Sequence, residues 1–386
     1  MIAWPGVRRG PARRERPGTP RAGAPVAYRE PTVATLTHHA SERSATVPSP
    51  TLADVARQAG VSKGTASKAL NGVTGVSAGT RERVAAAAAE LGWTPSYAAR
   101  ALSRASTGVF GLALARSSET VGTESFFMAM VAGLEEELAL TDRALLIQLV
   151  PDVEAESELL ARWAAERRVD GVVLLDARLE DPRAAVIERS GLAAAAMASS
   201  PLSPMISRLA VDEDERMDLV LDRLMTAVDD RPAGAGRHLL YLGGLPQFQH
   251  VMARERRFRE RCGAVGVGAS VLHSDYQQHD VSRWTREVLA LHREAGCRGV
   301  VVDNDLLAAQ LLVELGKDGV RVPEDLAIVA LEDSILCTVT SPAITALHRD
   351  TREAGRLLAR LLVRHIEEGT LTEDIGPGGM VVRGSG

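Results

Sequence analysis

The amino-acid sequence predicts two different folds in one chain: an N-terminal all-α helix-turn-helix headpiece, and an α/β core of two lobes with doubly wound parallel sheets. Three observations support this prediction. Helical patterns separated by glycine turns occupy residues 51–95, and short apolar runs alternate with amphipathic segments from residue 108 onward. The net charge also changes along the chain, because residues 1–107 carry +9 while the remaining residues carry -14 of a total of -5.

The composition is that of a globular protein and argues against several other classes. With 386 residues, 45% of them hydrophobic, the chain has enough apolar material for about two or three domains. Three widely separated cysteines, Cys262, Cys297 and Cys337, have neither metal-ligand nor redox spacing and predict buried thiols in a reducing cytoplasm. No apolar run approaches about 18 residues, and no apolar segment follows the N-terminal arginines. We therefore expect neither a membrane span nor a secretory signal.

Residues 1–50 form the first predicted segment, a disordered extension rich in Arg and Pro. The segment has no helical or strand period and carries eight Arg against three Glu. Such a tail suits nonspecific attraction to DNA, and the alternative is a dispensable extension without function.

Residues 51–95 are predicted to fold as three short helices. Thr51 is a good N-cap, and the apolar residues that follow it recur at helical spacing. Gly60 allows the positive φ of a tight turn, Ser62 can cap a second helix at 63–70, and Asn71-Gly72 ends it. Ser77 then opens a third helix over about 78–91, ended by Gly92.

The second of these helices has the side chains of a DNA-reading helix. Lys63, Thr65, Ser67 and Lys68 would be exposed, and these short polar or basic groups suit base edges and phosphates in the major groove. The alternative is a small helical bundle with a solvated polar face.

Residues 96–107 are expected to form a hinge helix and linker. Pro95 begins a segment of small residues in which Leu102 stands between Arg100 and Arg104. An apolar wedge flanked by arginines is the chemistry of minor-groove insertion, whereas the alternative is a linker helix that packs on its own protein.

Residues 108–386 show the alternation of a βα repeat, which favours two lobes over one large sheet. Ligands in such folds bind at the carboxyl ends of the strands and between lobes. The predicted strands are Val109–Ala115, Ala144–Val150, Gly171–Leu175, Leu192–Met197, Leu209–Val211, His238–Leu242, Ser270–His273, Gly299–Val302 and Leu326–Leu331.

Residues 51–102 resemble the DNA-binding headpiece and hinge helix of the lactose-repressor/galactose-repressor family. The resemblance rests on Thr51-Leu-Ala-Asp-Val-Ala, Gly60-Val-Ser, Asn71-Gly, Ala88-Ala-Glu-Leu-Gly-Trp-Thr-Pro95 and Ala99-Arg-Ala-Leu102. Segments of the body, such as Arg168-Val-Asp-Gly-Val-Val and Asp303-Asn-Asp-Leu-Leu-Ala308, fall in the order of the same family. The resemblance implies a periplasmic-binding-protein-like core, used for effector binding and dimerisation.

The resemblance also implies which residues contact DNA. Lys63, Gly64 and Lys68 match base-reading positions, although Gly64 departs from the larger polar residue that the family often has there. Leu102 matches the leucine that opens the central base step of a palindromic operator. The full implied set is Thr51, Ser62, Lys63, Gly64, Thr65, Ser67, Lys68, Asn71, Ser96, Arg100 and Leu102.

For the effector cleft, the resemblance implies Phe126, Phe127, Arg256, Tyr276, Asn304, Asp305 and Glu332. Two of the positions differ from the family pattern. Glu124-Ser125 precedes Phe126 where the family has Asn-Pro, and Glu332 stands where the family has an aspartate. These departures leave the class of effector open.

These features predict a homodimeric, sequence-specific transcriptional repressor that is cytoplasmic and associated with the nucleoid. Its expected partners are a palindromic double-stranded operator and a small-molecule effector, such as a sugar. We expect no catalytic residues, no metal and no cofactor, because phosphate-binding loops, nucleophile elbows and metal-ligand spacings are missing from the sequence. The alternatives are an effector-independent or activating regulator, a solute-binding protein, or an enzyme with scattered carboxylates.

Overall fold

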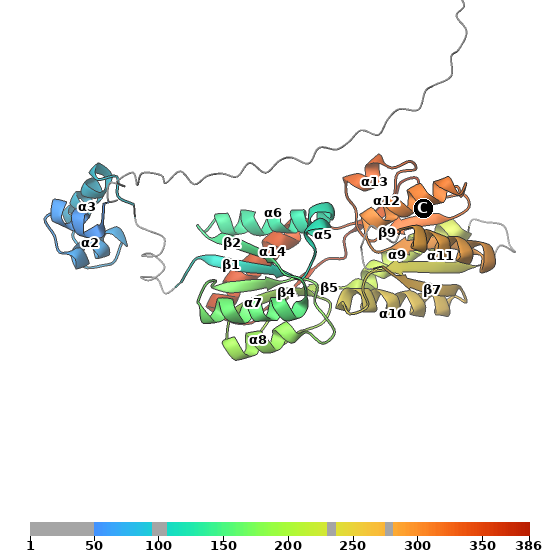
Figure 1. The fold of residues 1–386 in the computed structure, drawn as a ribbon, viewed down its shortest axis with the longest axis horizontal. Coiled ribbons are helices and arrows are strands. Elements are labelled where there is room, and N and C mark those ends of the chain that lie inside the picture. Colours follow the sequence, from blue (N-terminus) through green and yellow to red (C-terminus); the bar gives the residue numbers. More distant parts are fainter. Residues whose placement is uncertain (1–49, 95–105, 230–236, 275–280) are drawn as a thin grey trace, which may run out of the picture. The chain divides into compact units, whose positions relative to one another are not determined.

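The protein is shown in Figure 1 as a computed structural model, which describes residues 50–94, 106–229, 237–274 and 281–386. The chain forms two compact units that divide between Thr94 and Pro95. The predicted extension up to residue 49, and residues 96–105 of the predicted hinge, lie outside the described residues.

The first unit contains three helices, α1 (Leu52–Gln58), α2 (Lys63–Leu70) and α3 (Ala78–Glu90). Each begins at a hydroxyl cap, because the side chains of Thr51, Ser62 and Ser77 accept hydrogen bonds from backbone N–H groups of the first helical turn. Gly60 has a φ of 66°, so the turn between α1 and α2 uses the conformation that glycine adopts without strain. The predicted helix at 63–70 and its caps are confirmed.

The second unit contains two six-stranded sheets with helices on both faces (Figure 1). The sheet of the first lobe, β11-β5-β4-β3-β1-β2, is parallel throughout, and that of the second, β12-β10-β9-β8-β6-β7, is parallel except for the β10–β12 pair. The first lobe comprises β1 (Val109–Leu114), α5 (Ser118–Thr123), α6 (Ser125–Ala139), β2 (Ala144–Leu149), α7 (Val153–Ala165), β3 (Gly171–Leu174), α8 (Pro182–Ser190), β4 (Ala193–Ala198), β5 (Ser207–Val211), α14 (Thr351–Glu368) and β11 (Thr372–Ile375). The second comprises α9 (Glu213–Asp229), β6 (His238–Gly243), α10 (Gln249–Ala264), β7 (Gly268–His273), α11 (Val281–Glu294), β8 (Cys297–Val302), α12 (Asp305–Lys317), β9 (Ala327–Ala330), α13 (Ile335–Val339), β10 (Thr345–His348) and β12 (Gly379–Val381).

The chain passes between the lobes three times. It leaves the first lobe after β5, returns between β10 and α14, and crosses again between β11 and β12. Figure 1 shows the result for α14, a late helix that lies beside α6 and the early strands. The crossings bring their own residues to the boundary between the lobes, next to the carboxyl ends of the strands.

Each sheet is covered by apolar side chains on both faces. Trp163 packs on one face of the first sheet and Phe127 on the other, while Trp284 and Phe258 do the same in the second lobe. The three cysteines are free and buried, as predicted. None of the helices in the described ranges is both long and apolar enough to cross a membrane.

All nine predicted strands are present, with ends that differ by up to two residues. Three further strands, β10, β11 and β12, were not predicted. They have three or four residues each, and β11 is the mostly polar Thr-Glu-Asp-Ile segment, so neither length nor alternation separates them from loops.

Two glycines allow α6 and α14 to approach closely, and a stability measurement can test this contact. A Cβ on Gly133 would clash with the carbonyl oxygen of Arg352, and one on Gly355 with that of Met130. We expect Gly133→Ala to lower the free energy of unfolding of the core by about 1–3 kcal/mol, measured by urea denaturation. Gly263→Ala in α10 is the control, because a Cβ there meets nothing and alanine favours the helix. Equal stability of the two variants would contradict the close approach.

Candidate functional site

The headpiece presents one face of α2 to solvent. Ala66 is the one buried residue of this helix and packs on α1 and α3, whereas Lys63, Gly64 and Lys68 are exposed. Within the described residues, neither lysine forms an ion pair, so both ammonium groups are available to an anionic partner. Their positions are five residues apart, which places them about 140° apart around the helix.

The hydroxyl groups near α2 serve partly in local structure. The Ser62 Oγ accepts a hydrogen bond from the backbone N–H of Thr65 at 3.0 Å and lies 2.8 Å from the Thr65 Oγ1. The Asn71 Nδ2 donates to the Ser67 Oγ at 3.4 Å, and Thr51 forms a capping box with Asp54. These hydrogen bonds stabilise the first and last turns of α2, where the exposed Lys63, Gly64 and Lys68 lie.

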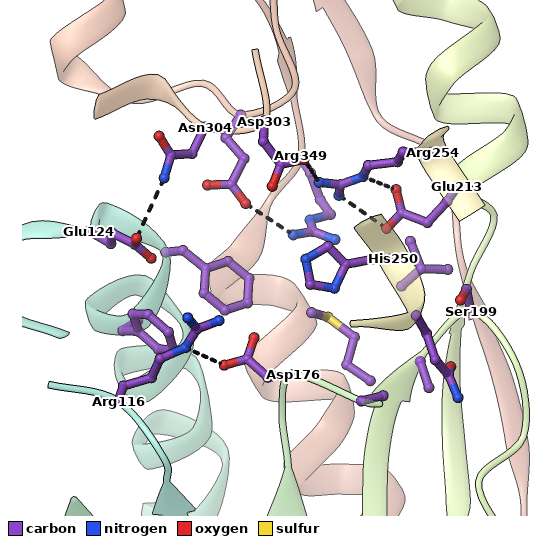
Figure 2. Close-up of a pocket in the computed structure, with 18 residues that line it drawn as sticks. Arg116, Glu124, Asp176, Ser199, Glu213, His250, Arg254, Asp303, Asn304 and Arg349 are labelled. Atoms are coloured by element: carbon purple, nitrogen blue, oxygen red, sulfur yellow. Dashed lines mark hydrogen bonds and ion pairs between the residues drawn. The ribbon is translucent and has the colours of Figure 1, made fainter. Parts of the chain in front are cut away.

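The second unit contains a cavity between the lobes, at the carboxyl ends of the strands (Figure 2). Arg116, Asp176 and Ser199 follow strands of the first lobe, and Asp303 and Glu332 follow strands of the second. Glu213 and Arg349 come from two of the crossings. Parallel strands end at one edge of each sheet, so both lobes turn the edge that binds ligands toward this space.

A buried ion-pair network forms the second lobe's wall. The Arg254 guanidinium donates to both oxygens of Glu213, from Nε at 2.6 Å and Nη2 at 3.1 Å, and from Nη1 to the Asp303 Oδ1 at 2.7 Å. The Tyr241 hydroxyl donates to the same Asp303 oxygen at 2.7 Å. Burial disfavours the charged form of Glu213, but Arg254 and Arg216 outweigh it and lower the pKa of this carboxyl to about 2.

The first lobe contributes a second ion pair, in which the Arg116 Nε donates to the Asp176 Oδ2 at 2.8 Å. The guanidinium also lies 4.6 Å from the ring centroid of Phe248, which comes from the second lobe and stacks on His250. Asp176 has a φ of 51°, a conformation that aspartate tolerates better than most residues. Burial raises its pKa but Arg116 lowers it more, so the carboxyl is held charged.

A third group of charges is less well paired. Glu124, at the junction of α5 and α6, is contacted by the Asn304 Nδ2 at 3.5 Å (Figure 2), and Glu332 lies 3.8 Å from an Arg349 nitrogen. Burial and the charge of Glu332 raise the pKa of Glu124 to about 8, and burial raises that of Glu332 to about 7 against the effect of Arg349. The Arg349 Nε is buried and has no hydrogen-bond partner among the described residues.

The lobes are held together around this cavity. Phe248 forms an isolated antiparallel bridge with Arg178, and the backbone N–H of Gln249 donates to the Ala177 carbonyl at 2.8 Å. On the other side, the Ser125 Oγ donates to the Asp305 Oδ2 at 3.1 Å. The enclosed volume is about 70 Å³, room for a few water molecules. Among the described residues, no group of three or more His, Cys, Asp or Glu side chains could hold a metal ion.

The structure brings together most of the residues predicted for the cleft. Phe126, Phe127, Asn304 and Glu332 line the cavity, and Asp305 is buried directly behind it as the first residue of α12. Tyr276 lies outside the described residues, as do the predicted DNA-contacting residues Ser96, Arg100 and Leu102. The remaining predicted DNA-contacting residues all lie at the start of α1 or in and around α2.

Arg256 does not line this cavity. Its guanidinium is half exposed, pairs with Asp214 and Glu260, and lines a neighbouring hollow between the lobes that shares Glu213 with the cavity. The core residue Phe258 sets the phase of α10, and Arg254, one turn earlier, shares the inward face, whereas Arg256 points about 200° away. Arg254 is therefore the arginine of α10 that reaches the cavity, and a contact of Arg256 with the effector stays a prediction.

Sequence reasoning also missed Arg116, Asp176, Asp303 and the crossing residues Glu213 and Arg349. The first three could have been found, because each follows a predicted strand within two residues of its observed end, where a parallel sheet binds ligands. The crossing residues had no such signal, since the crossings themselves were not predicted.

Comparison with known families and proteins agrees with this architecture. Residues 51–96 match the family of bacterial regulatory proteins, lacI family, and residues 233–385 match the periplasmic binding protein-like domain. The chain is 30% identical over 333 residues to the HTH-type transcriptional regulator CelR of Thermobifida fusca, covering 84% of this chain and 94% of CelR. It is 24% identical over 322 residues to the HTH-type transcriptional repressor PurR of Photobacterium profundum, covering 82% of this chain and 92% of PurR.

Two solved structures extend the comparison. A complex of the transcriptional regulator CelR with cellobiose aligns with a TM-score of 0.63 at 27% identity, over 87% of this chain and 100% of the other. The lac repressor dimer bound to operator and the anti-inducer ONPF aligns with a TM-score of 0.71 at 20% identity, over 87% and 98%, and shows the fold alone. With its headpiece, its two-lobed core and a relative matched over almost its whole length, this chain belongs to the lacI family of bacterial DNA-binding transcriptional regulators.

Proposed function

We propose that this regulator is a homodimeric repressor that binds a palindromic operator and that a carbohydrate effector in the interlobe cavity changes its affinity for DNA. The observation that carries the proposal is the pairing of an exposed basic α2 face with a cavity lined by both lobes. The repressor PurR and the cellobiose complex of CelR support it as relatives with a corresponding function and ligand. Members of the family are DNA-binding regulators rather than enzymes, and we propose that this chain performs no catalysis.

The proposed DNA contacts start from α2. A major groove admits one helix, and the Lys63 and Lys68 ammonium groups can reach base acceptors or phosphates on either side of it. Gly64 lies between them and has no side chain, so Lys63 and Lys68 would make the main contacts with the bases. Thr51, Ser62, Thr65, Ser67 and Asn71 would contact phosphates, while Ser96, Arg100 and Leu102 would act in the minor groove.

The proposed effector class follows from the chemistry of the cavity. The rings of Phe126 and Phe127, arranged edge to face, supply the apolar surface on which the face of a sugar ring packs. The ion pairs Arg116–Asp176 and Arg254–Asp303 and the amide of Asn304 supply fixed donors and acceptors for hydroxyl groups. Asp305, which is buried directly behind the lining, would hold these polar groups in position.

Coupling to DNA follows from the position of the cavity between the lobes. Both lobes line it, so the affinity of an effector that contacts both depends on how the lobes are arranged. An effector that prefers one arrangement shifts the population toward it, and side-chain contacts between the lobes such as Ser125–Asp305 would change with the arrangement. In a dimer, this changes the spacing of the two headpieces on their half-sites.

The test is to incubate the full-length protein with sheared DNA of its own genome near 150 mM salt and to sequence the retained fragments. We expect one palindromic motif, and carbohydrates related to the adjacent genes should change retention of that motif. Diffuse retention would contradict sequence-specific binding. A motif whose retention no small molecule changes would instead support an effector-independent regulator.

Substitution of Lys68 tests the proposed reading of bases. We expect Lys68→Ala to weaken operator binding by about 1–3 kcal/mol and to relax preference at one position in each half-site, measured by fluorescence anisotropy on operator variants. Lys317→Ala, an exposed lysine of α12 in the second unit, is the matched control and should bind like the wild type. A uniform loss on all DNA with a shallower salt dependence would assign Lys68 to a phosphate.

Substitution of Phe126 tests the proposed effector site separately from DNA binding. We expect Phe126→Ala to weaken the effector roughly 10- to 100-fold through loss of apolar contact, while operator affinity without effector stays unchanged. Met128→Ala, on the exposed side of α6, is the control. If Phe126→Ala alters neither effector affinity nor the response of the operator complex, the effector binds elsewhere.

A further inference from the structure

The interlobe cavity has more carboxyl groups than guanidinium groups. Five carboxyl groups and three guanidinium groups line the cavity. Asp305 and Arg216 lie directly behind the lining and add one group of each kind, so six carboxyl groups and four guanidinium groups surround the cavity. The lining carboxyls are Glu124, Asp176, Glu213, Asp303 and Glu332, and the lining guanidinium groups are those of Arg116, Arg254 and Arg349.

The arginines at this cavity differ in the number and closeness of their carboxylate partners. Arg116 pairs with Asp176, and Arg254 pairs with both Glu213 and Asp303, while Arg216 lies 3.3 Å from Glu213. Arg349 is the remaining cation of the lining, and it lies 3.8 Å from Glu332. Glu124 therefore has no guanidinium partner in the described part of the chain, and its side chain accepts one hydrogen bond there, from the Asn304 Nδ2 at 3.5 Å.

Glu124 and Glu332 face the same space from opposite lobes. Glu124 begins α6 in the first lobe and makes no side-chain cap to that helix, so its carboxyl has no structural role at the helix end. Glu332 follows β9 in the second lobe, and both side chains line the cavity. The charge of Glu332 disfavours ionisation of Glu124. A cation placed between the two carboxyl groups would favour the ionised form of both and would join the two lobes.

The lining of the cavity also indicates that the cation is organic rather than a metal ion. No group of three or more metal-ligating side chains is present among the described residues, which argues against a metal ion at this place. Phe126 lines the same space and already lies under the Arg349 guanidinium, with the ring centroid 5.6 Å from its Cζ, so its face suits an organic cation as well. The unpartnered Arg349 Nε adds a donor for a ligand oxygen.

We propose that the effector is an amino sugar, whose protonated amine binds between Glu124 and Glu332 while its hydroxyl groups contact the paired arginines and Asn304. This inference rests on the proposed function, because it names the chemistry of the effector for that cavity. A neutral sugar would leave Glu124 without a counter-charge, whereas an ammonium group forms charge-assisted hydrogen bonds with the carboxylates of both Glu124 and Glu332.

Binding of an amine by Glu124 has a defined proton linkage. The charged groups that face Glu124 are Glu332, Arg116, Asp176 and Asp303, and together with burial they raise its pKa to about 8. Near pH 6 the empty site therefore holds a proton on Glu124, whereas an amine resembling an α-amino group, with a pKa of about 7.7–8.0, is protonated. Burial raises the pKa of Glu332 as well, to about 7, so near pH 6 it is also mostly protonated. The bound complex needs both carboxylates, so binding releases protons, and affinity should rise as the pH increases from about 5 to 7.

The experiment compares matched ligands by isothermal titration calorimetry with the full-length protein. Glucose, galactose, mannose and cellobiose are each paired with the amino analogue and with the N-acetylated amine, which has the same nitrogen without its charge. We expect at least one amino analogue to bind at least about tenfold more tightly than both partners. At pH 6, titrations in buffers of different ionisation enthalpy should show release of a proton by the amino analogue alone.

Variants of two glutamates complete the test. Glu124→Gln keeps the shape of the side chain and changes no helix cap, and it should weaken binding of the amino sugar roughly 10- to 100-fold and reduce the number of protons released. Glu119→Gln, on the exposed surface of α5, is the control and should leave both unchanged. The folding of Glu124→Gln is verified by comparing its circular dichroism spectrum and thermal unfolding with those of the wild type.

The outcomes separate the two proposals. If a neutral or N-acetylated member binds as tightly as its amino analogue in every pair, the amino-sugar inference is overturned while a carbohydrate effector remains. If none of the sugars binds, both the inference and the proposed carbohydrate effector fail. Tight binding of an amino sugar without proton release, or with full affinity in Glu124→Gln, would remove Glu124 from the site and overturn the assignment.

Discussion

The interlobe site depends on the ion pairs that the Arg254 guanidinium forms. This guanidinium joins Glu213, the first residue after the segment that crosses from β5 to α9, to Asp303, which follows β8. One side chain thus holds this interlobe segment against the end of a strand. Taking these three charges out of water is costly, and the network contributes geometry more than net stability. Because both acidic partners are occupied by Arg254 and Tyr241, the second lobe presents a fixed wall rather than a set of free carboxylates.

Contacts between the lobes are of two kinds, and they differ in how an effector can act on them. The bridge between Arg178 and Phe248 and the bond from Gln249 to the Ala177 carbonyl use backbone groups, which change little with ligand or pH. The opposite side of the cavity is joined by side chains alone, through Ser125 to Asp305 and Asn304 to Glu124. The second side is therefore where the closed arrangement is sensitive to what occupies the cavity.

The sequence predicted the parts of the molecule that follow from local chemistry. Caps such as Ser62 and the turn at Gly60 depend on a few neighbouring residues, and the buried strands are short runs of apolar residues, so these were confirmed. The crossings could not be predicted, because α14 looks like any amphipathic helix and only packing against α6 assigns it to the first lobe. Arg254 and Arg256 differ by two residues in an arginine-rich segment, and only the buried Phe258 fixes which of them points inward.

The charge distribution of the chain gives the cavity a role in selecting against ligands as well as for them. Residues after 107 carry -14, which keeps the polyanionic partner of a DNA-binding protein away from the core and leaves DNA to the basic headpiece. Arg116, Arg254 and Arg216 pair with carboxylates at this cavity, and Arg349 lies beside Glu332. When ionised, Glu124 and Glu332 add negative charge that an anionic ligand would have to overcome. Specificity by such repulsion needs no additional attractive contact, so the two glutamates that depart from the family pattern disfavour anionic metabolites.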